Sequence, residues 1–273
     1  MRRRLQMQLA AEYSAESEAL AREVLCEFYD LTFTQLIMNG RQAVADSEVA
    51  QIAEWTERLK RHEPLQYISG WAHFCGLQME VNCNVLIPRP ETQEIVDLVV
   101  EDLPEEAAVL DIGTGSGCIA VAVSSRKPDA KVSAVDISAD ALEVARRNAE
   151  RNGVKVNFQQ CDILKEMPEG EFDMVVSNPP YVCDRERAQM ERNVLDFEPW
   201  QALFVPDDDP LRFYRVIAQR CVSGLLKCGG KLVFEINERY GRETAAMLRE
   251  MGFDEVQVVK DYCEKDRFVV GRN

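Results

Sequence analysis

The sequence predicts an α/β fold with a mostly parallel sheet, preceded by a small helical domain. Two observations predict the sheet: short apolar runs alternate with helical stretches in the C-terminal two thirds, and only a short segment joins the last two runs. A third observation, a Gly-poor helical pattern before Pro64, predicts the separate domain. We place a helical docking domain at 1–70, a β-hairpin linker at 71–90 and the α/β domain at 91–273.

The N-terminal segment has the spacing of amphipathic helices. Between Leu5 and His62, apolar residues such as Leu20, Val24 and Phe28 recur about one helical turn apart. Eight basic residues precede Pro64, against eleven acidic ones. This balance favours protein docking over reading DNA.

The linker has the pattern of strands. Two runs flank Asn82-Cys83-Asn84: Leu77, Met79 and Val81 before it, Val85 and Ile87 after it. They predict a β-hairpin that turns at this tripeptide. Because each proline favours extended conformations in the residue before it, Pro88-Arg89-Pro90 predicts a stiff strap leading to a helix at Thr92–Val100.

Seven strands are predicted in the α/β domain. They are Ala108–Ile112, Lys131–Asp136, Lys155–Gln160, Phe172–Ser177, Gly230–Ile236, Glu255–Val259 and Arg267–Gly271. Helices between most of them indicate a sheet covered on both faces. Because Lys260–Asp266 is too short for a crossover helix, we expect the last two strands to pair antiparallel.

Composition excludes several classes of protein. The 273 residues, 46% of them hydrophobic, can form a proper core. With 32 Lys and Arg against 47 Asp and Glu, the net charge is −15, so no global positive field attracts phosphate backbones. We therefore expect no direct nucleic-acid binding, although a local basic groove stays open.

Cysteine usage and the chain start predict a cytoplasmic protein. The nine cysteines include no C-x-x-C pair, which indicates reduced thiols. His62 and His73 lie far from any cysteine pair, so no metal site is predicted. The basic start Met1–Arg4 runs into polar residues, and no apolar run reaches about 18 residues, so we expect neither a signal peptide nor a membrane span.

A glycine-rich loop, Asp111–Gly117, follows the first predicted strand. Glycines there permit a tight turn and a close approach of backbone to ligand. A dinucleotide fingerprint needs its third glycine where Cys118 stands, whereas here it is Gly117. The G-x-G-x-G spacing after an acid resembles class I S-adenosylmethionine methyltransferases, in which this loop packs against the methionine part of the cofactor. The alternative is an ordinary strand–helix turn.

Two acidic residues stand where neighbouring strands end. Asp136 closes the second strand, at the edge where open α/β sheets bind ligands, and its carboxylate can accept both hydroxyls of a ribose. The alternative is an N-cap for the helix that begins near Ser138. After the third strand, Asp162 can accept from an adenine amino group while Ile163 covers the ring; a purely structural role for Asp162 stays open.

The segment Ser177-Asn178-Pro179-Pro180-Tyr181 closes the fourth strand beside the glycine loop. The two prolines fix φ and remove two N–H donors, which predicts a rigid turn that presents carbonyl oxygens. Asn178 adds a side-chain acceptor, and Tyr181 adds an aromatic face. A turn that merely ends a strand is the alternative.

This turn suits methyl transfer to a planar amide or aromatic amine. Such a nitrogen is a poor nucleophile because its lone pair is delocalised. The side-chain oxygen of Asn178 and the main-chain carbonyl of Pro179 can hold both N–H groups and aim the lone pair at the methyl group. The motif therefore predicts the reaction type but not the substrate.

Further motifs narrow the substrate. They are Pro64–Gly70, Leu86–Thr92, Phe197-Glu198-Pro199, and Asp261-Tyr262 with Arg267–Arg272. Together with the glycine loop and the Asn178 turn, they resemble the bacterial peptide chain release factor glutamine N5-methyltransferases, from about Pro64 to Arg272. The segment before Pro64 is similar only in length and character.

The resemblance implies a Rossmann-like methyltransferase sheet and methylation of the glutamine in the Gly-Gly-Gln loop of class 1 release factors, with S-adenosylhomocysteine as product and no metal. It implies a glutamine pocket lined by Asn178, Pro179, Pro180 and Tyr181. Cofactor contacts are expected from Gly113, Thr114, Gly115, Ser116, Gly117, Asp136, Asp162, Ile163 and Asn178. Ile163 departs from relatives that carry an aromatic residue there. No role is derived for Arg89 or Glu198.

Two other functions compete. An N6-adenine methyltransferase on DNA or RNA would use the same turn, with a flipped base stacked on Tyr181. It would need a basic recognition region, which the charge balance does not supply. A non-catalytic S-adenosylmethionine-binding protein would need neither Asn178 nor the intact glycine loop.

Overall fold

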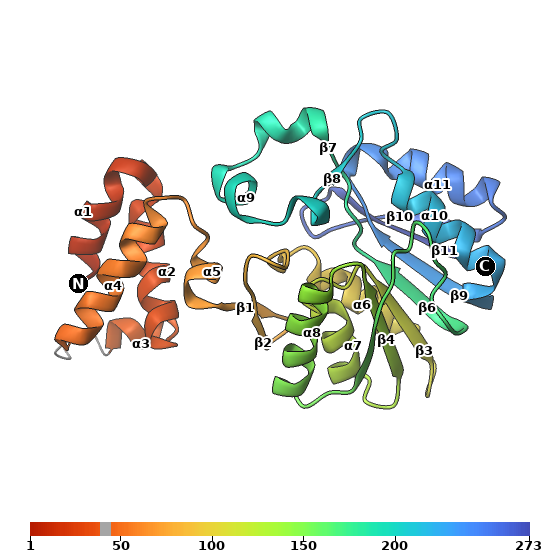
Figure 1. Ribbon diagram of the computed structural model, residues 1–273, viewed down its shortest axis with the longest axis horizontal. Helices are drawn as coiled ribbons and strands as arrows, with labels where there is room; N and C mark the ends of the chain where they lie inside the picture. Colours follow the sequence, from red (N-terminus) through yellow and green to blue (C-terminus); the bar gives the residue numbers. More distant parts are fainter. Residues whose placement is uncertain (39–44) are drawn as a thin grey trace. The chain divides into compact units, whose positions relative to one another are not determined.

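The computed structural model describes residues 1–38 and 45–273 (Figure 1). The chain divides into two compact units. The first combines Met1–Gly70 with Glu191–Phe197, and the second combines Trp71–Met190 with Glu198–Asn273. Each unit has its own core.

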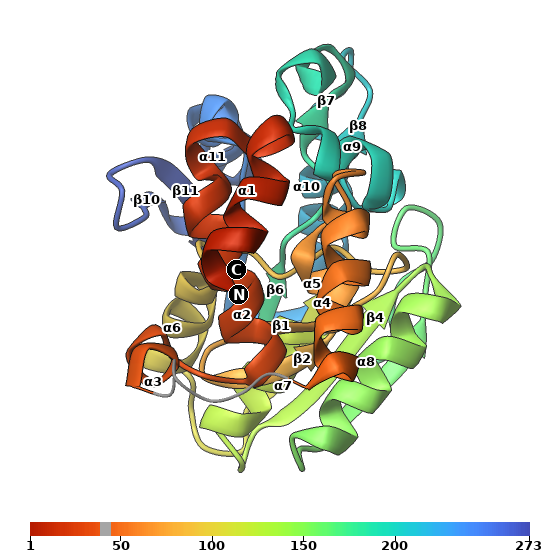
Figure 2. The same cartoon turned by 90° about the vertical axis from the view of Figure 1, so that its left-hand side faces the viewer.

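The first unit is helical, as predicted. Its helices are α1 (Arg2–Tyr13), η1 (Ser14–Glu16), α2 (Ser17–Tyr29), α3 (Phe33–Met38), α4 (Asp46–Leu59), α5 (Leu65–Ser69) and α9 (Arg192–Phe197). Figure 2 shows α1 and α2 in red and α4 in orange. Their apolar faces enclose Leu5, Leu9, Ala21, Val24, Leu25, Ile52, Leu59 and Ile68. The Tyr13 hydroxyl donates to the main-chain oxygen of Leu59 at 2.7 Å, which ties α1 to the end of α4.

The second unit holds a seven-stranded sheet in the order β10-β11-β9-β6-β3-β4-β5. Its strands are β3 (Ala108–Ile112), β4 (Lys131–Asp136), β5 (Val156–Gln160), β6 (Phe172–Ser177), β9 (Leu226–Glu235), β10 (Asp254–Lys260) and β11 (Asp266–Arg272). The first five are parallel, and β11 runs antiparallel to both neighbours. The antiparallel pairing expected of the last two strands is therefore confirmed.

Helices cover both faces of the sheet. Successive side chains of a strand point to opposite faces, so each face contributes apolar side chains to its own core. Val109 of β3 belongs to the core with α6 (Gln93–Glu101), α7 (Cys118–Arg126) and α8 (Ala139–Arg151). Its neighbour Leu110 belongs to the core with α10 (Arg212–Arg220) and α11 (Gly241–Glu250). Figure 1 shows these two sets of helices on opposite sides of the sheet.

The hairpin prediction is confirmed, but its strands are not those expected. They are β1 (Trp71–Phe74) and β2 (Leu77–Glu80), joined at Cys75-Gly76. Both turn residues have positive φ, 50° and 76°, as the tight turns of two-residue hairpins require. Val85 and Ile87 are buried without forming a strand. Their alternation therefore reflects burial, not strand pairing.

Short elements complete the second unit. The two-residue strands β7 (Val182–Cys183) and β8 (Phe204–Val205) pair in parallel. The helical turns are η2 (Asp184–Gln189), η3 (Trp200–Ala202), η4 (Cys221–Leu225) and η5 (Glu238–Tyr240). In the described part of the chain, no helix is both long enough and apolar enough to cross a membrane.

Candidate active site

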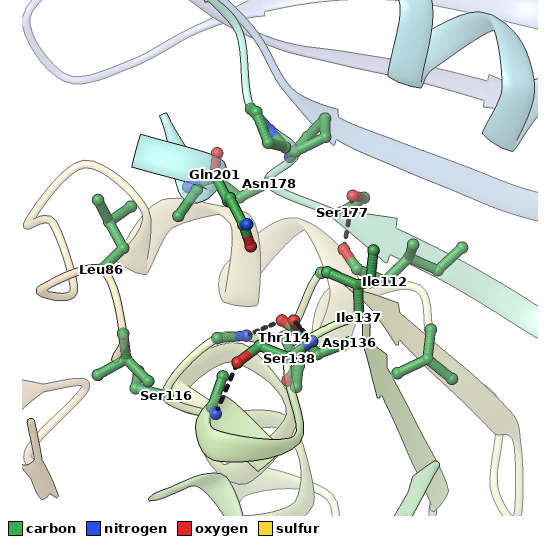
Figure 3. A pocket seen from close by; sticks show the side chains of 18 of the residues that line it. Leu86, Ile112, Thr114, Ser116, Asp136, Ile137, Ser138, Ser177, Asn178 and Gln201 are labelled. Carbon is green, nitrogen blue, oxygen red and sulfur yellow. Dashed lines mark hydrogen bonds between the residues drawn. The ribbon is translucent and has the colours of Figure 1, made fainter. Parts of the chain in front are cut away.

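The strand order creates a point where connections diverge. From β3 the chain proceeds outward through β4 and β5, then returns to place β6 on the other side of β3. Open α/β sheets bind ligands at such a point, outside the carboxyl ends of the strands. A cavity of about 510 Å³ lies there within the second unit (Figure 3).

Five segments line this cavity. They are Gly113–Ser116 after β3, Asp136–Ser138 after β4, Cys161–Leu164 after β5, Ser177–Pro180 after β6, and the strap, which in the structure extends over residues 83–92. Phe213 and Ile217 of α10 and Pro199, Gln201 and Ala202 add to the wall. In Figure 3, Asn178 and Gln201 lie across the pocket from Thr114, Ser116 and Asp136.

The main-chain N–H and C=O groups of the glycine loop make most of its hydrogen bonds. The N–H groups of Gly113 and Thr114 both donate to the main-chain oxygen of Val135, at 2.8 and 3.1 Å. The φ of Gly117 is 79°, and a Cβ added there would lie 2.9 Å from the Cβ of Ala145. This glycine therefore permits both the turn and the close approach of α8.

The hairpin supports the same loop. Asn148 of α8 is fully buried, and its Nδ2 donates to the main-chain oxygens of Ser116 and Glu80, both at 2.9 Å. Its Oδ1 accepts from the Glu80 N–H at 2.6 Å. One side chain thus joins β2, α8 and the glycine loop, a role that no local sequence pattern indicated.

Asp136 faces the loop from the end of β4. Its Oδ2 accepts from the Gly115 N–H at 2.8 Å, and its Oδ1 accepts from the Ser138 N–H at 2.9 Å. Burial raises the pKa of this carboxyl, and the N–H donors of Ser138 and Gly115 oppose the rise. The N-cap of α8 is Ser138, whose Oγ accepts from the Ala141 N–H at 3.1 Å. The alternative role of Asp136 as the cap is therefore wrong.

A second carboxyl, Asp111, supports the loop from beneath. It is 1% exposed, and its Oδ2 accepts from the Thr114 hydroxyl at 2.6 Å. Its Oδ1 has no hydrogen-bond partner among the described residues. Burial raises the pKa of Asp111 to about 7, against the hydrogen bond from Thr114.

Asp162 and Ile163 both line the cavity. Asp162 also stabilises its own turn: its Oδ1 accepts from the Leu164 N–H at 3.1 Å, and its Oδ2 lies 2.8 Å from the Lys165 Nζ. The hydrogen bond from Lys165 lowers the pKa of this carboxyl. Phe213 of α10 also lines the cavity and packs against the core that contains Ile163. The sequence prediction did not include Phe213, because no local pattern links α10 to the end of β5.

The turn after β6 is held by its own side chains, which form hydrogen bonds with distant segments. The Ser177 hydroxyl donates to the main-chain oxygen of Ile112 at 2.7 Å, joining the turn to β3. Asn178 Nδ2 donates to Thr92 Oγ1 at 3.3 Å. Asn178, Pro179 and Pro180 line the cavity, whereas Tyr181 packs against the core beside α10. The Tyr181 hydroxyl donates to Glu235 Oε1 at 3.1 Å.

Glu198 connects two walls of the cavity, although sequence motifs suggested no role for it. Its buried carboxylate accepts from Arg89 Nη2 at 2.6 Å and from the Ile87 N–H at 3.1 Å. The strap that contains Ile87 and Arg89 is thereby tied to the segment that begins at Pro199. The described residues contain no group of three or more His, Cys, Asp or Glu side chains suited to a metal ion.

Known proteins are similar to this chain over most of its length. The family described as methyltransferase small domain matches residues 93–196, and the PrmC N-terminal domain matches residues 1–70. A release factor glutamine methyltransferase from Bacteroides thetaiotaomicron is 44% identical, over 93% of this chain and 92% of its own. One from Flavobacterium psychrophilum is 38% identical, over 93% and 91%. The crystal structure of a methyltransferase from Pyrococcus furiosus is similar in fold, with a TM-score of 0.52 and 19% identity over 84% of this chain and 98% of that one.

Proposed function

Because the chain belongs to the release factor glutamine methyltransferase family, we propose that it methylates a glutamine side chain of peptide chain release factors. The acceptor is the amide nitrogen, N5, of the glutamine in the Gly-Gly-Gln loop of class 1 release factors. S-adenosylmethionine is the methyl donor, and S-adenosylhomocysteine is the product. One observation carries this proposal: the glycine loop and the Asn178 turn line a single cavity at the point where the strand connections diverge.

The residues of the cavity fit the methyl donor. S-adenosylmethionine supplies an electrophilic methyl group on a sulfonium. Each oxygen of Asp136 accepts one main-chain N–H, and a carboxylate has about four acceptor sites, so two remain for ribose hydroxyls. Ile163, Phe213 and Ile217 line the cavity and supply apolar surface for an adenine ring, and Asp162 lines the same cavity as an acceptor.

The turn after β6 fits a glutamine amide. No donor among the described residues reaches Asn178 Oδ1, and the two prolines present main-chain carbonyls without competing N–H groups. Asn178 Oδ1 and the Pro179 carbonyl then accept the two amide hydrogens and aim the lone pair at the methyl group. Positioning of this kind is worth about 7–11 kcal/mol in favourable cases. The same carbonyl dipoles stabilise the positive charge that develops on nitrogen.

A neutral amide gives little binding energy, so recognition must extend over a larger surface. We assign this docking to the helical domain at 1–70, which carries no excess of basic residues. The cytoplasm is the compartment we assign to the reaction, and nine free cysteines support a reducing environment.

The decisive experiment is methyl transfer followed by mass spectrometry. Wild-type protein and labelled S-adenosylmethionine are incubated with a class 1 release factor, with the same factor carrying alanine for the Gly-Gly-Gln glutamine, and with DNA and RNA oligomers. We expect one methyl group on that glutamine and none on the alanine variant. A methyl group on adenine instead would refute the proposal and support an N6-adenine methyltransferase.

A further inference from the structure

The loop between β10 and β11 carries the most exposed large apolar side chain among the described residues. Tyr262 is 85% exposed, so its ring has no packing role in the second unit. The motif that it forms with Asp261 also takes no part in the chemistry proposed above. Tyrosine is enriched in protein interfaces, because its large ring contacts a partner at little cost in side-chain entropy.

Hydrogen bonds hold the loop on both sides of Tyr262. Asp261 is 4% exposed, and its Oδ1 accepts from the N–H groups of Cys263 and Lys265, at 2.9 and 3.0 Å. The Tyr262 N–H donates to the carboxylate of Glu94, on the first turn of α6, at 3.2 Å from Oε2. The backbone around Tyr262 is therefore fixed, while its ring is exposed to a partner.

Tyr262 lies at the same edge of the sheet as the Asn178 turn. Because β11 is antiparallel to both of its neighbours, β10 runs parallel to β9 and β6, and the carboxyl ends of all three lie at this edge. Three strand spacings of about 4.8 Å put the ends of β10 and β6 roughly 14 Å apart. A single glutamine side chain is too short for this distance, but an interface of about 800 Å² per partner, roughly 30 Å across, covers it.

The charges around Tyr262 favour a protein partner over a nucleic acid. A lysine stands on each side of it in the sequence, and each lies near an acid. Lys260 Nζ is 3.7 Å from the carboxylate of Glu264, and Lys265 Nζ is 3.9 Å from that of Glu238. A phosphate backbone is bound by basic side chains whose charge is not already offset.

We propose that Tyr262 contacts the release factor outside its Gly-Gly-Gln loop and holds it while the glutamine lies in the cavity. This contact rests on the proposed function. It belongs to the second unit, so it adds to the docking assigned to the domain at 1–70. Tyr262 does not touch the reacting atoms, and Asp261 and Glu94 position it through the backbone.

The kinetic test compares Tyr262→Ala with Tyr262→Phe. Loss of the ring should raise KM for a class 1 release factor about 30-fold, the effect of one interface hot spot, with kcat and affinity for S-adenosylmethionine unchanged. Phenylalanine keeps the ring, so its KM should stay within about threefold of wild type. A wild-type KM in Tyr262→Ala, or a fall in kcat at unchanged KM, would overturn the proposal.

Val222→Ala is the matched control. Val222 is 42% exposed and lies in η4, which leads directly into the amino end of β9, at the opposite edge of the sheet from Asn178. This substitution should leave KM for the release factor unchanged. Because both side chains are exposed, neither alanine variant should lower the thermal midpoint of unfolding appreciably. An equal rise of KM in both variants would refute a specific contact at Tyr262.

A cross-linking experiment tests the contact without activity. The photoreactive residue benzoylphenylalanine replaces Tyr262 in one sample and Val222 in another, and each full-length protein is irradiated with S-adenosylhomocysteine and a class 1 release factor. We expect a cross-link to the release factor only from position 262, mapped by mass spectrometry outside the Gly-Gly-Gln loop. No cross-link from position 262, or one within that loop, would overturn the proposal.

The two experiments separate this contact from the proposed function. If the wild type methylates the release factor and Tyr262→Ala has no effect on KM, the contact is refuted and the proposed function stands. If the cross-link from position 262 forms but the wild type does not methylate the Gly-Gly-Gln glutamine, the proposed function is refuted and the contact is supported.

Discussion

The two loops that meet at the cavity are held in different ways. The glycine loop after β3 is held mainly through its own main-chain groups: the N–H groups of Gly113 and Thr114 donate to Val135, and that of Gly115 donates to the Asp136 carboxylate. The turn after β6 is held through its own side chains, by the Ser177–Ile112 and Asn178–Thr92 hydrogen bonds. A loop of the first kind depends on backbone conformation. A turn of the second kind depends on partners that the fold brings from 65 and 86 residues away.

The largest expected effect is a loss of kcat when the turn after β6 is changed. Asn178→Ala should lower kcat about 10²–10³-fold, the range seen when one oriented group that stabilises transition-state charge is removed. Affinity for S-adenosylmethionine should change far less. Single-turnover kinetics and calorimetry measure the two quantities. Near-wild-type turnover would show that the side chain is not needed for transfer.

Gly117→Ala tests how tightly the glycine loop after β3 packs against α8. The new Cβ would sit at positive φ and 2.9 Å from Ala145, so we expect a loss of about 2–4 kcal/mol in unfolding free energy from strain and overpacking together. Gly153→Ala is the matched control: its φ is 67°, with nothing within 4 Å of the added Cβ. Its loss should be about 1 kcal/mol. Equal losses in urea denaturation would remove the packing argument.

Asp136→Ala tests whether the loop and its carboxylate bind the cofactor. We expect affinity for S-adenosylmethionine to fall by about 1–3 kcal/mol, the value of hydrogen bonds to a charged acceptor. Asp140→Ala, at an exposed position on the first turn of α8, should leave affinity unchanged. Calorimetric titration of both variants decides. Equal affinities would confine Asp136 to a structural role.

The smallest effect concerns the cap of α8. Ser138→Ala removes the side-chain acceptor for the Ala141 N–H and should lower the unfolding free energy by about 1 kcal/mol. Thermal denaturation measures this change. Ser138→Thr, which keeps a side-chain hydroxyl acceptor at the cap, should cost less stability. Equal losses in Ser138→Ala and Ser138→Thr would show that the cap hydrogen bond does not contribute.

Local patterns in the sequence determined much of this protein. Alternating apolar runs predicted the seven strands, and the short Lys260–Asp266 connection predicted the antiparallel pair, because strand alternation and crossover length are local properties. The glycine spacing and Asn178-Pro179-Pro180 likewise singled out two segments that line the cavity, whereas Tyr181 packs against the core. These motifs, with those from Pro64 onward, also predicted the family, which the relatives confirm.

Tertiary structure decided the rest. Val85 and Ile87 alternate like a strand, yet they are buried in a strap whose Ile87 N–H donates to Glu198, 111 residues away. Asn178 carries no motif that relates it to Thr92, 86 residues away, and the two form a hydrogen bond only in the folded chain. The same holds for Tyr181 and Glu235, 54 residues apart on the neighbouring strand β9. Burial and side-chain hydrogen bonds between distant segments depend on where the whole chain places each residue, so no local pattern encodes them.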